Sequence, residues 1–199
     1  MTEPVGVVLA GGASRRMGTD KAFVPVHGRS MVLRVADALV SGGCGPLVCQ
    51  GGDPRRLAAV GLDLWPDVSP PEGPVGAIRS ALGRAVEAFP EVDVVVVAAC
   101  DLPFLNGGVV RSLVAAATGA GRAAGATTSG RPHLVAAWPV LLSTVVARAA
   151  DSGVTTYRQL VADVPSVELE VAESAVVNVN RPGDVPVGDV PETRRGRHR

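Results

Sequence analysis

Short apolar runs alternate along the chain with segments whose apolar residues recur at helical spacing. Val5 to Ala10 and Val92 to Ala99 are the clearest runs, and β-branched residues dominate both. The second is apolar at nearly every position, which is typical of a strand buried on both faces, so we expect it to be the central strand of a sheet. The other predicted strands are 46–50, 62–65, 123–128, 134–138, 167–169 and 176–179.

Predicted helices lie between these strands. Apolar residues recur at helical spacing from Ser30, placed as the N-cap, to a stop at Gly42. The same spacing predicts helices over 75–88, 108–117, 139–150 and 155–162, whereas the Pro-rich stretch from Asp67 to Pro74 predicts an irregular loop. Alternating strands and helices indicate an α/β fold, a single three-layer Rossmann-like domain with a mostly parallel sheet.

The domain is expected to span residues 1–182. From residue 183 onward the chain is rich in Gly, Pro and charged residues and ends in several arginines. Such a composition cannot bury enough apolar surface to offset the entropy of ordering the chain. Residues 183–199 are therefore predicted to be a disordered basic tail.

Composition narrows the class of protein. The 199 residues are 47% apolar but only 3% aromatic, and 19 basic residues balance 19 acidic ones. This balance argues against a nucleic-acid-binding surface. No apolar run is long enough to cross a membrane, and Gly11 and Gly12 end the first one too early for a signal peptide. Cys44, Cys49 and Cys100 lack the spacing of a metal site, and reduced thiols fit a cytoplasmic protein.

The segment from Leu9 to Lys21 combines three glycines with basic residues directly after the first predicted strand. Glycines let the backbone approach a ligand closely, and successive N–H groups in such a turn bind anions. Arg15, Arg16 and Lys21 repel one another unless an anion lies among them, and a triphosphate suits this set. The segment has neither the P-loop nor the G-x-G-x-x-G pattern. The alternative is an ordinary strand-to-helix turn with solvated arginines.

Asp101 follows the predicted central strand, at the end where parallel sheets bind ligands. A carboxylate there suits Mg²⁺, which takes few protein carboxylates and several phosphate or water oxygens. The alternative is an aspartate that caps the following helix. The glycine segment ends its strand at the same edge, so a triphosphate and a metal are expected together.

The stretch LAGGASRRMGTDKA resembles the signature loop of the molybdenum cofactor guanylyltransferases. Ala10-Gly11-Gly12 stands where related cytidylyltransferases usually have Ala-Ala-Gly, and Asp20-Lys21 also looks like the guanylyl branch. Cys100 to Leu105 is similar to the family pattern C-D-x-P-[FY]-[LI]. The resemblance runs in order from about Val5 to about Asp184.

The resemblance implies a nucleotidyltransferase that moves GMP from Mg²⁺-bound GTP to the phosphate of molybdopterin, in its molybdenum-loaded form, with release of pyrophosphate. It also implies transient contact with proteins that insert or deliver the molybdenum cofactor. Two alternatives stay open. One is a cytidylyltransferase acting on the same pterin or another small phosphate, and the other is a non-catalytic nucleotide-binding partner of cofactor assembly.

Roles for individual residues follow from the resemblance. Lys21 and Arg15 would stabilise the triphosphate and Asp101 would hold Mg²⁺, so these are the expected catalytic residues. Gln50 stands where the family commonly has Asn near the base, and Asp67 aligns with an aspartate that contacts nucleotide. The implied nucleotide-binding set is Leu9, Ala10, Gly11, Gly12, Lys21, Gln50, Asp67 and Asp101.

A second group of residues is expected near the acceptor. Asn178 and Asn180 match an N-x-N pattern near the family's active site, and alternation places both amides on one face of a predicted strand. Arg131 and His133 are candidates for binding the pterin, although the family usually has His before Pro where this chain has Pro132 before His133. The alternatives are a turn-forming Asn pair and a structural His.

Overall fold

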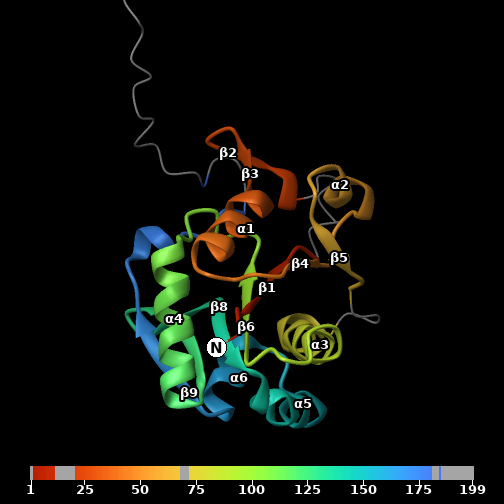
Figure 1. Ribbon diagram of the computed structural model, residues 1–199. Helices are drawn as coiled ribbons and strands as arrows, with labels where there is room; N and C mark the ends of the chain where they lie inside the picture. Colours follow the sequence, from red (N-terminus) through yellow and green to blue (C-terminus); the bar gives the residue numbers. More distant parts are fainter. Residues whose placement is uncertain (1, 12–20, 68–71, 181–183, 185–199) are drawn as a thin grey trace, which may run out of the picture.

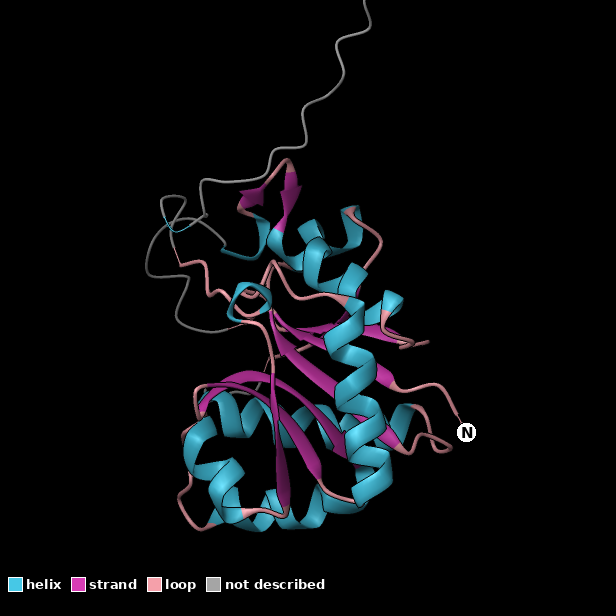
Figure 2. Cartoon of the chain, turned by 90° about the vertical axis from the view of Figure 1, so that its left-hand side faces the viewer, coloured by secondary structure: helices cyan, strands magenta, loops and turns pink. Residues whose placement is uncertain are grey.

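The computed structural model of the protein describes residues 2–11, 21–67, 72–180 and 184. A central sheet lies between two layers of helices (Figures 1 and 2). Its seven described strands follow the order β5-β4-β1-β6-β8-β7-β9, and among them only β8 runs antiparallel to its neighbours. The strands are β1 Val5–Leu9, β4 Leu47–Gln50, β5 Asp63–Trp65, β6 Val94–Ala99, β7 Ala123–Thr128, β8 Arg131–Pro139 and β9 Ser166–Glu170. The predicted α/β fold with a mostly parallel sheet is confirmed.

Helices cover both faces of this sheet, and a small hairpin stands beside it (Figure 1). The α-helices are α1 Met31–Ser41, α2 Pro54–Ala59, α3 Gly73–Ala88, α4 Gly107–Ala120, α5 Ser143–Asp151 and α6 Tyr157–Asp163. The hairpin pairs β2 Pro25–Val26 with β3 Arg29–Ser30. The 3-10 turns are η2 Lys21–Phe23, η3 Val140–Leu142 and η4 Glu173–Ala175.

The strand β6 divides the core into two clusters. Alternation sends Val94, Val96 and Ala98 toward α1 and α4, whereas Val95 and Val97 face α3, α5 and α6. All five side chains are buried. The expectation of a central strand buried on both faces is therefore confirmed, and the core consists largely of Val, Ala and Leu.

Some predicted elements differ from the structure. No strand forms over 176–179. After η4 this segment runs beside the turn that follows β6, and the N–H of Val179 donates to the carbonyl of Asp101 at 2.9 Å. Val179 is buried in a small cluster with Val26 and Met31, so its apolar character reflects packing without a strand partner. The prediction of a strand there was wrong.

Helix boundaries also shift. Gly73 and Pro74 belong to the first turn of α3 and not to the predicted loop, and proline is tolerated there because it lacks an N–H. Pro139 ends β8, and the predicted helix over 139–150 is η3 followed by α5. The sequence patterns missed α2, whose N-cap Asp53 accepts from the N–H groups of Arg55 and Arg56.

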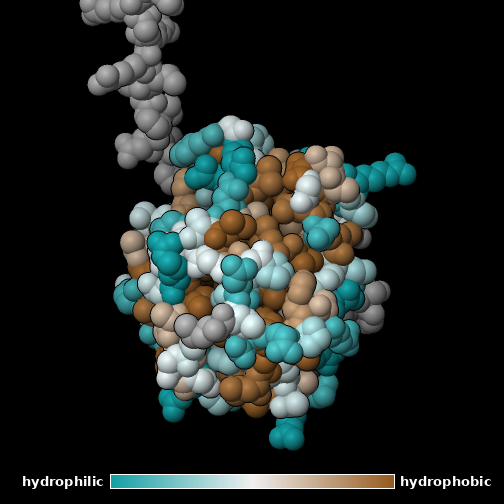
Figure 3. Space-filling model, in the orientation of Figure 1, coloured by the Kyte–Doolittle hydropathy of each residue, from teal (hydrophilic) through white to brown (hydrophobic). Residues whose placement is uncertain are grey.

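The described residues also bear on location and surface. No helix among them combines the length and apolarity that a membrane span requires. Hydrophobic and hydrophilic residues are intermingled over the face shown in Figure 3.

The three cysteines are buried and form no disulfide, and burial raises the pKa of the Cys44 and Cys49 thiols to about 12. The tail lies outside the described residues except for Asp184, so the domain limits remain a prediction.

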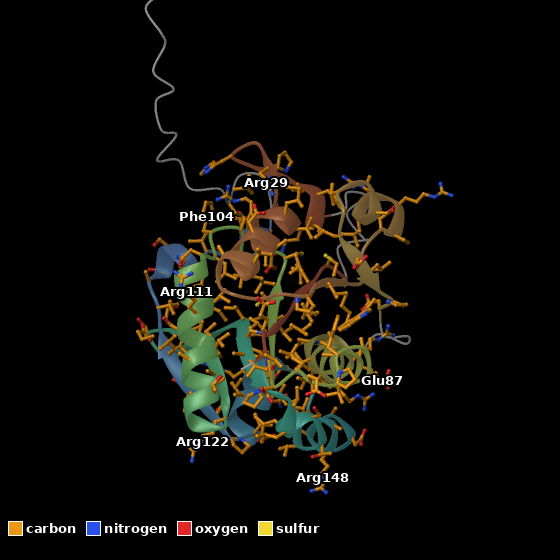
Figure 4. All side chains as sticks on the ribbon, in the orientation of Figure 1. Arg29, Glu87, Phe104, Arg111, Arg122 and Arg148 are labelled. Carbon is orange, nitrogen blue, oxygen red and sulfur yellow. The ribbon has the colours of Figure 1, made fainter. Side chains whose placement is uncertain are left out.

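Strand direction gathers the candidate residues at one edge of the sheet. β1, β4, β5 and β6 are parallel, so their carboxyl ends lie along the same edge, and the antiparallel β8 begins there. Figure 4 shows Phe104, shortly after β6, near the end of the molecule that carries the β2–β3 hairpin. Arg122 and Arg148 mark the opposite end in the same view.

Candidate active site

A chain of hydrogen bonds joins three distant segments at this edge. The Lys21 ammonium donates to Asp101 Oδ2 at 2.7 Å and to Asn180 Oδ1 at 2.5 Å. Asn180 Nδ2 in turn donates to Asn178 Oδ1 at 2.5 Å. The side chains of Lys21 and Asp101 are 13% and 21% exposed, so this ion pair is only partly screened by water. The structure therefore unites four of the residues singled out in the sequence.

Local backbone contacts fix these side chains. The N–H of Cys100 donates to the carbonyl of Leu9 at 3.1 Å, which keeps the segment after β6 beside β1. Lys21 opens η2, where the following residue, Ala22, is buried. The N–H of Val179 donates to the Asp101 carbonyl, so the segment that carries both asparagines is attached directly to Asp101.

One oxygen of Asp101 has no partner among the residues that the structure describes. Oδ2 binds Lys21, whereas Oδ1 is buried and accepts no hydrogen bond from them. A buried carboxylate oxygen in this state is costly, which favours a cation or donor brought by a ligand. No group of three or more His, Cys, Asp or Glu among the described residues is arranged to hold a metal. A single carboxylate with nearby amide oxygens fits Mg²⁺, whose other ligands are commonly phosphate and water.

The predicted nucleotide side is assembled around the ends of β1, β4 and β5. The N–H groups of Ala10 and Gly11 donate to the Gln50 carbonyl at 2.9 and 3.1 Å. A Cβ added at Gly11 would overlap the Asp67 carboxylate, so Asp67 lies directly against this glycine. A Cβ added at Gly51 would lie 2.6 Å from the Gly11 Cα, so only glycine permits this approach of β1 and β4.

Two expected contacts look different in the structure. The Gly11 N–H already donates to Gln50 and so does not point freely toward a phosphate. The Gln50 side chain is 1% exposed, and its Nε2 donates to the Ala77 carbonyl of α3 at 3.0 Å. The other polar atom of this side chain, Oε1, is buried and accepts no hydrogen bond from the residues that the structure describes. Gly12, Arg15 and Asp20 lie outside the described residues.

A cavity of about 570 Å³ opens beside Asp101. It lies between the turn after β6, the β7–β8 hairpin and the segment from η4 to Asn180. Arg131 and His133, at the start of β8, reach the same cavity as Asn178 and Asn180, so the expected acceptor residues do come together. The lining residues are Asp101, Leu102, Thr128, Arg131, Pro132, His133, Leu134, Glu173, Val176, Val177, Asn178 and Asn180.

His133 lies in this wall beside the hairpin turn. Its Nε2 lies 2.7 Å from Thr128 Oγ1. Burial lowers the pKa of His133 below its ordinary value, and the charge of Arg131 adds to this, while Glu173 and Glu170 act in the opposite direction. A neutral imidazole offers the cavity one nitrogen that is not used by Thr128.

Thr128 and Glu173 were missed in the sequence. Thr128 ends β7 just before Ser129 and Gly130, whose backbone angles φ of 49° and 71° form the hairpin turn, and the Gly-containing turn was the available indication. Glu173 sits in a short 3-10 turn with no motif around it. Only the fold brings it to the cavity.

Comparison with known proteins identifies the family of the chain. A family model described as the MobA-like NTP transferase domain matches residues 6–179. A molybdenum cofactor guanylyltransferase of Cereibacter sphaeroides is 34% identical over 188 residues, which cover 90% of this chain and 92% of that protein. The enzyme of the same name from Rhizobium meliloti is 36% identical over 144 residues, covering 71% of this chain and 66% of that protein, a little under two thirds.

Solved structures share the fold. Molybdopterin-guanine dinucleotide biosynthesis protein A from Archaeoglobus fulgidus has a TM-score of 0.69 at 22% identity, covering 91% of this chain and 94% of that chain. Rv0371c of Mycobacterium tuberculosis, solved in complex with manganese, has a TM-score of 0.69 at 18% identity, covering 92% and 96% of the two chains. The resemblance noted in the signature loop thus extends over nearly the whole chain, which belongs to the family of MobA-like NTP transferases and is a nucleotidyltransferase.

Proposed function

We propose that the protein transfers GMP from GTP to the phosphate of molybdopterin and releases pyrophosphate. The observation that carries this proposal is the Lys21–Asp101–Asn180 cluster, which lies between the end of the glycine-containing strand β1 and the cavity of about 570 Å³. One side of the cluster suits a triphosphate and the other offers room for a bulky acceptor. The names of the relatives from Cereibacter sphaeroides and Rhizobium meliloti support this choice of substrates.

Asp101 would hold Mg²⁺ through its buried Oδ1, and Asn180 stands close enough to assist. Bound there, Mg²⁺ would neutralise the triphosphate and the charge that develops during transfer. Lys21 would bind a phosphate oxygen, and Arg15 of the signature loop would add a second positive charge. The manganese complex of the Mycobacterium tuberculosis protein supports a divalent ion in this fold.

The chemical step needs no protein nucleophile. An oxygen of the acceptor phosphate forms a bond to the α-phosphorus of GTP, and the bond from that phosphorus to the bridging oxygen breaks as pyrophosphate leaves. The attacking oxygen is already ionised, so a general base is unnecessary. Catalysis is then positioning and charge neutralisation by Lys21 and its neighbours.

The acceptor would occupy the cavity. Asn178 and Asn180 would orient its phosphate near Asp101, while Arg131 and His133 would contact the remainder of the molecule. On the nucleotide side, Leu9, Ala10, Gly11 and Gly12 would lie along the triphosphate, Gln50 Oε1 would face the base, and Asp67 would contact the nucleotide near Gly11. We further propose a cytoplasmic site of action, which the three reduced, buried cysteines support, and transient contact with proteins that insert or deliver the cofactor.

The test is a transfer assay with molybdopterin, Mg²⁺ and each of GTP, CTP, ATP and UTP. We expect the guanine dinucleotide and pyrophosphate to form in equal amounts with GTP, detected by mass spectrometry and a pyrophosphate assay. A preference for CTP would identify a cytidylyltransferase, and binding of a triphosphate without pyrophosphate release would identify a non-catalytic nucleotide-binding protein. Either outcome would contradict the proposal.

A further inference from the structure

Two opposite charges face the cavity without neutralising each other. Arg131 stands at the start of β8 and Glu173 opens η4, and both residues line the cavity. Neither side chain forms a hydrogen bond or an ion pair with any other residue that the structure describes. Both are exposed, so a ligand that enters the cavity can reach them.

The neighbouring carboxylate behaves differently. Glu170 accepts from the N–H of Ser129 at 2.7 Å through Oε1 and from Thr127 Oγ1 at 3.2 Å through Oε2, so it fixes the β7–β8 hairpin. The Glu173 carboxylate makes no such hydrogen bond with the residues that the structure describes. Its backbone is nevertheless held, because its carbonyl accepts from Val176 N at 3.1 Å and Val176 is buried. The Glu173 carboxylate therefore lies at the cavity on a held backbone and is available to a ligand that enters.

His133 shows that the two charges share one neighbourhood. Arg131 lowers its pKa while Glu173 raises it, so both charges lie within electrostatic reach of the same ring. The cavity wall therefore presents a cation, an imidazole and an anion. A ligand that satisfies all three must carry an anionic group as well as a set of hydrogen-bond donors.

We propose that Glu173 recognises the aminopyrimidinone edge of the pterin. This inference rests on the proposed function. That edge carries a ring N–H beside an exocyclic amino group, and one carboxylate can accept from both at once in a bidentate pair. Arg131 is left to contact another part of the same acceptor, apart from the phosphate that Asn178 and Asn180 would orient. Glu173 is thus a specificity-determining residue, with no part in the bonds that form and break.

Such a contact would discriminate between acceptors chiefly by disfavouring those that cannot pair with Glu173. A phosphate acceptor without adjacent donors would cover Glu173 and leave its charge unpaired, which costs more than the lost hydrogen bonds alone. Guanine carries the same pair of donors as a pterin, so guanosine is the one rival with matching chemistry. The experiment therefore compares these two compounds.

The test is fluorescence titration with 6-hydroxymethylpterin, in the absence of GTP, for the unmodified protein and Glu173→Gln. Glutamine keeps one acceptor but presents an NH₂ group where the pterin needs a second, so we expect binding weaker on the order of tenfold to a hundredfold. Glu168→Gln is the matched control, because Glu168 is exposed on β9 and lies outside the cavity. GTP binding should be the same in all three proteins.

An analogue gives a second readout. A pterin methylated on the ring N–H should bind the unmodified protein about as weakly as the unmethylated pterin binds Glu173→Gln. The variant should bind the two pterins with equal affinity. Equal pterin affinity in the unmodified protein and Glu173→Gln would overturn this inference and leave the proposed function standing. The inference would also be overturned if the unmodified protein bound no pterin, or if it bound guanosine more strongly than pterin and in a Glu173-dependent way. If the unmodified protein bound no pterin and transferred GMP to a different phosphate, the proposed acceptor would be refuted as well.

Discussion

Within the part of the chain that the structure describes, the Lys21 ammonium has two side-chain partners. Its ammonium balances the Asp101 charge at 2.7 Å and also binds Asn180. A triphosphate would compete for the same ammonium, and Asp101 would then need another cation. Nucleotide and metal are therefore expected to bind more tightly together than separately, since each supplies what the other displaces.

Removing either charge tests this residue pair. Asp101→Ala should lower the transfer rate by about a thousandfold or more, because the developing charge loses its metal, and Lys21→Ala should lower it by about a hundredfold. Circular dichroism should show both variants folded, and calorimetry with Mn²⁺ should show loss of metal binding only in Asp101→Ala. Near-normal rates in both variants would remove these residues from the site.

The pKa of His133 predicts how stability depends on pH. Its folded-state pKa lies below the ordinary value of 6.5, mainly because burial disfavours the charged ring. The unfolded chain therefore takes up a proton more readily than the folded protein, and stability is lost as pH falls through about 6.5. Urea midpoints at about pH 7.5 and pH 5.5 should show a smaller loss for His133→Gln than for the unmodified protein. An equal loss in both would contradict the assignment.

At the scale of the secondary-structure elements, the ends of β1, β4 and β5 pack so closely that Gly11 and Gly51 have no room for a side chain. Gly11→Ala would push a methyl group into Asp67 and should reduce activity by about a hundredfold, because small displacements at a reacting centre are costly. Gly83→Ala is the matched control. Gly83 lies on the exposed face of α3 with no atom near its Cβ position, so alanine should stabilise the helix by about 1 kcal/mol and leave the rate unchanged. Equal activity of the two variants would show that the contact with Asp67 is unimportant.

The success of sequence analysis varied with the kind of element. Val94–Ala99 was readily predicted because a fully buried strand must be apolar throughout. α2 was missed because its six residues are too few for a helical period, although Asp53 followed by proline is a recognisable helix start. The antiparallel pairing of β8 with β7 could have been inferred, because the short Gly-containing turn between them can join only antiparallel strands. The pairing of β8 with β6 could not, since the two strands lie far apart in the sequence.

The candidate site was predictable where residues follow strands. Asp101 and the glycine segment both end parallel strands, and so their proximity followed from the fold class alone. The Asn178 and Asn180 amides meet as expected but not as members of a strand. Glu173 could not be predicted, because a lone glutamate in a polar segment becomes significant only when three segments enclose it in one cavity.

On the scale of the whole molecule, the proposed function assigns the two substrates to two halves of the sheet. The ends of β1, β4 and β5 would bind the nucleotide and the β7–β8 hairpin with η4 would bind the acceptor, while Asp101 follows β6 between them. The acceptor side can therefore vary its cavity residues without disturbing the glycine contacts of the nucleotide side.

The core that joins the two halves sets the overall stability. Trp138 of β8 is fully buried in the cluster beneath α3, α5 and α6. Trp138→Ala should lower the free energy of unfolding by about 3–5 kcal/mol, a large share of the stability typical of a domain. Urea denaturation would measure the loss. Added GTP and Mg²⁺ should recover part of it, because they bind the folded state alone. A change below about 1 kcal/mol would contradict this account of the core.

The hydrogen bond from Lys21 to Asn180 spans 159 positions of the chain, and the one to Asp101 spans 80. Proteins emerge from the ribosome beginning at the amino terminus. The Lys21–Asn180 hydrogen bond therefore cannot form until nearly all of the described chain has been synthesised. An unfinished chain can form β1 and its glycine segment, yet its ammonium lacks the amide that completes the cluster. On the proposed function, the protein would become able to consume nucleotide only late in its own translation, and fragments left by stalled ribosomes should not do so.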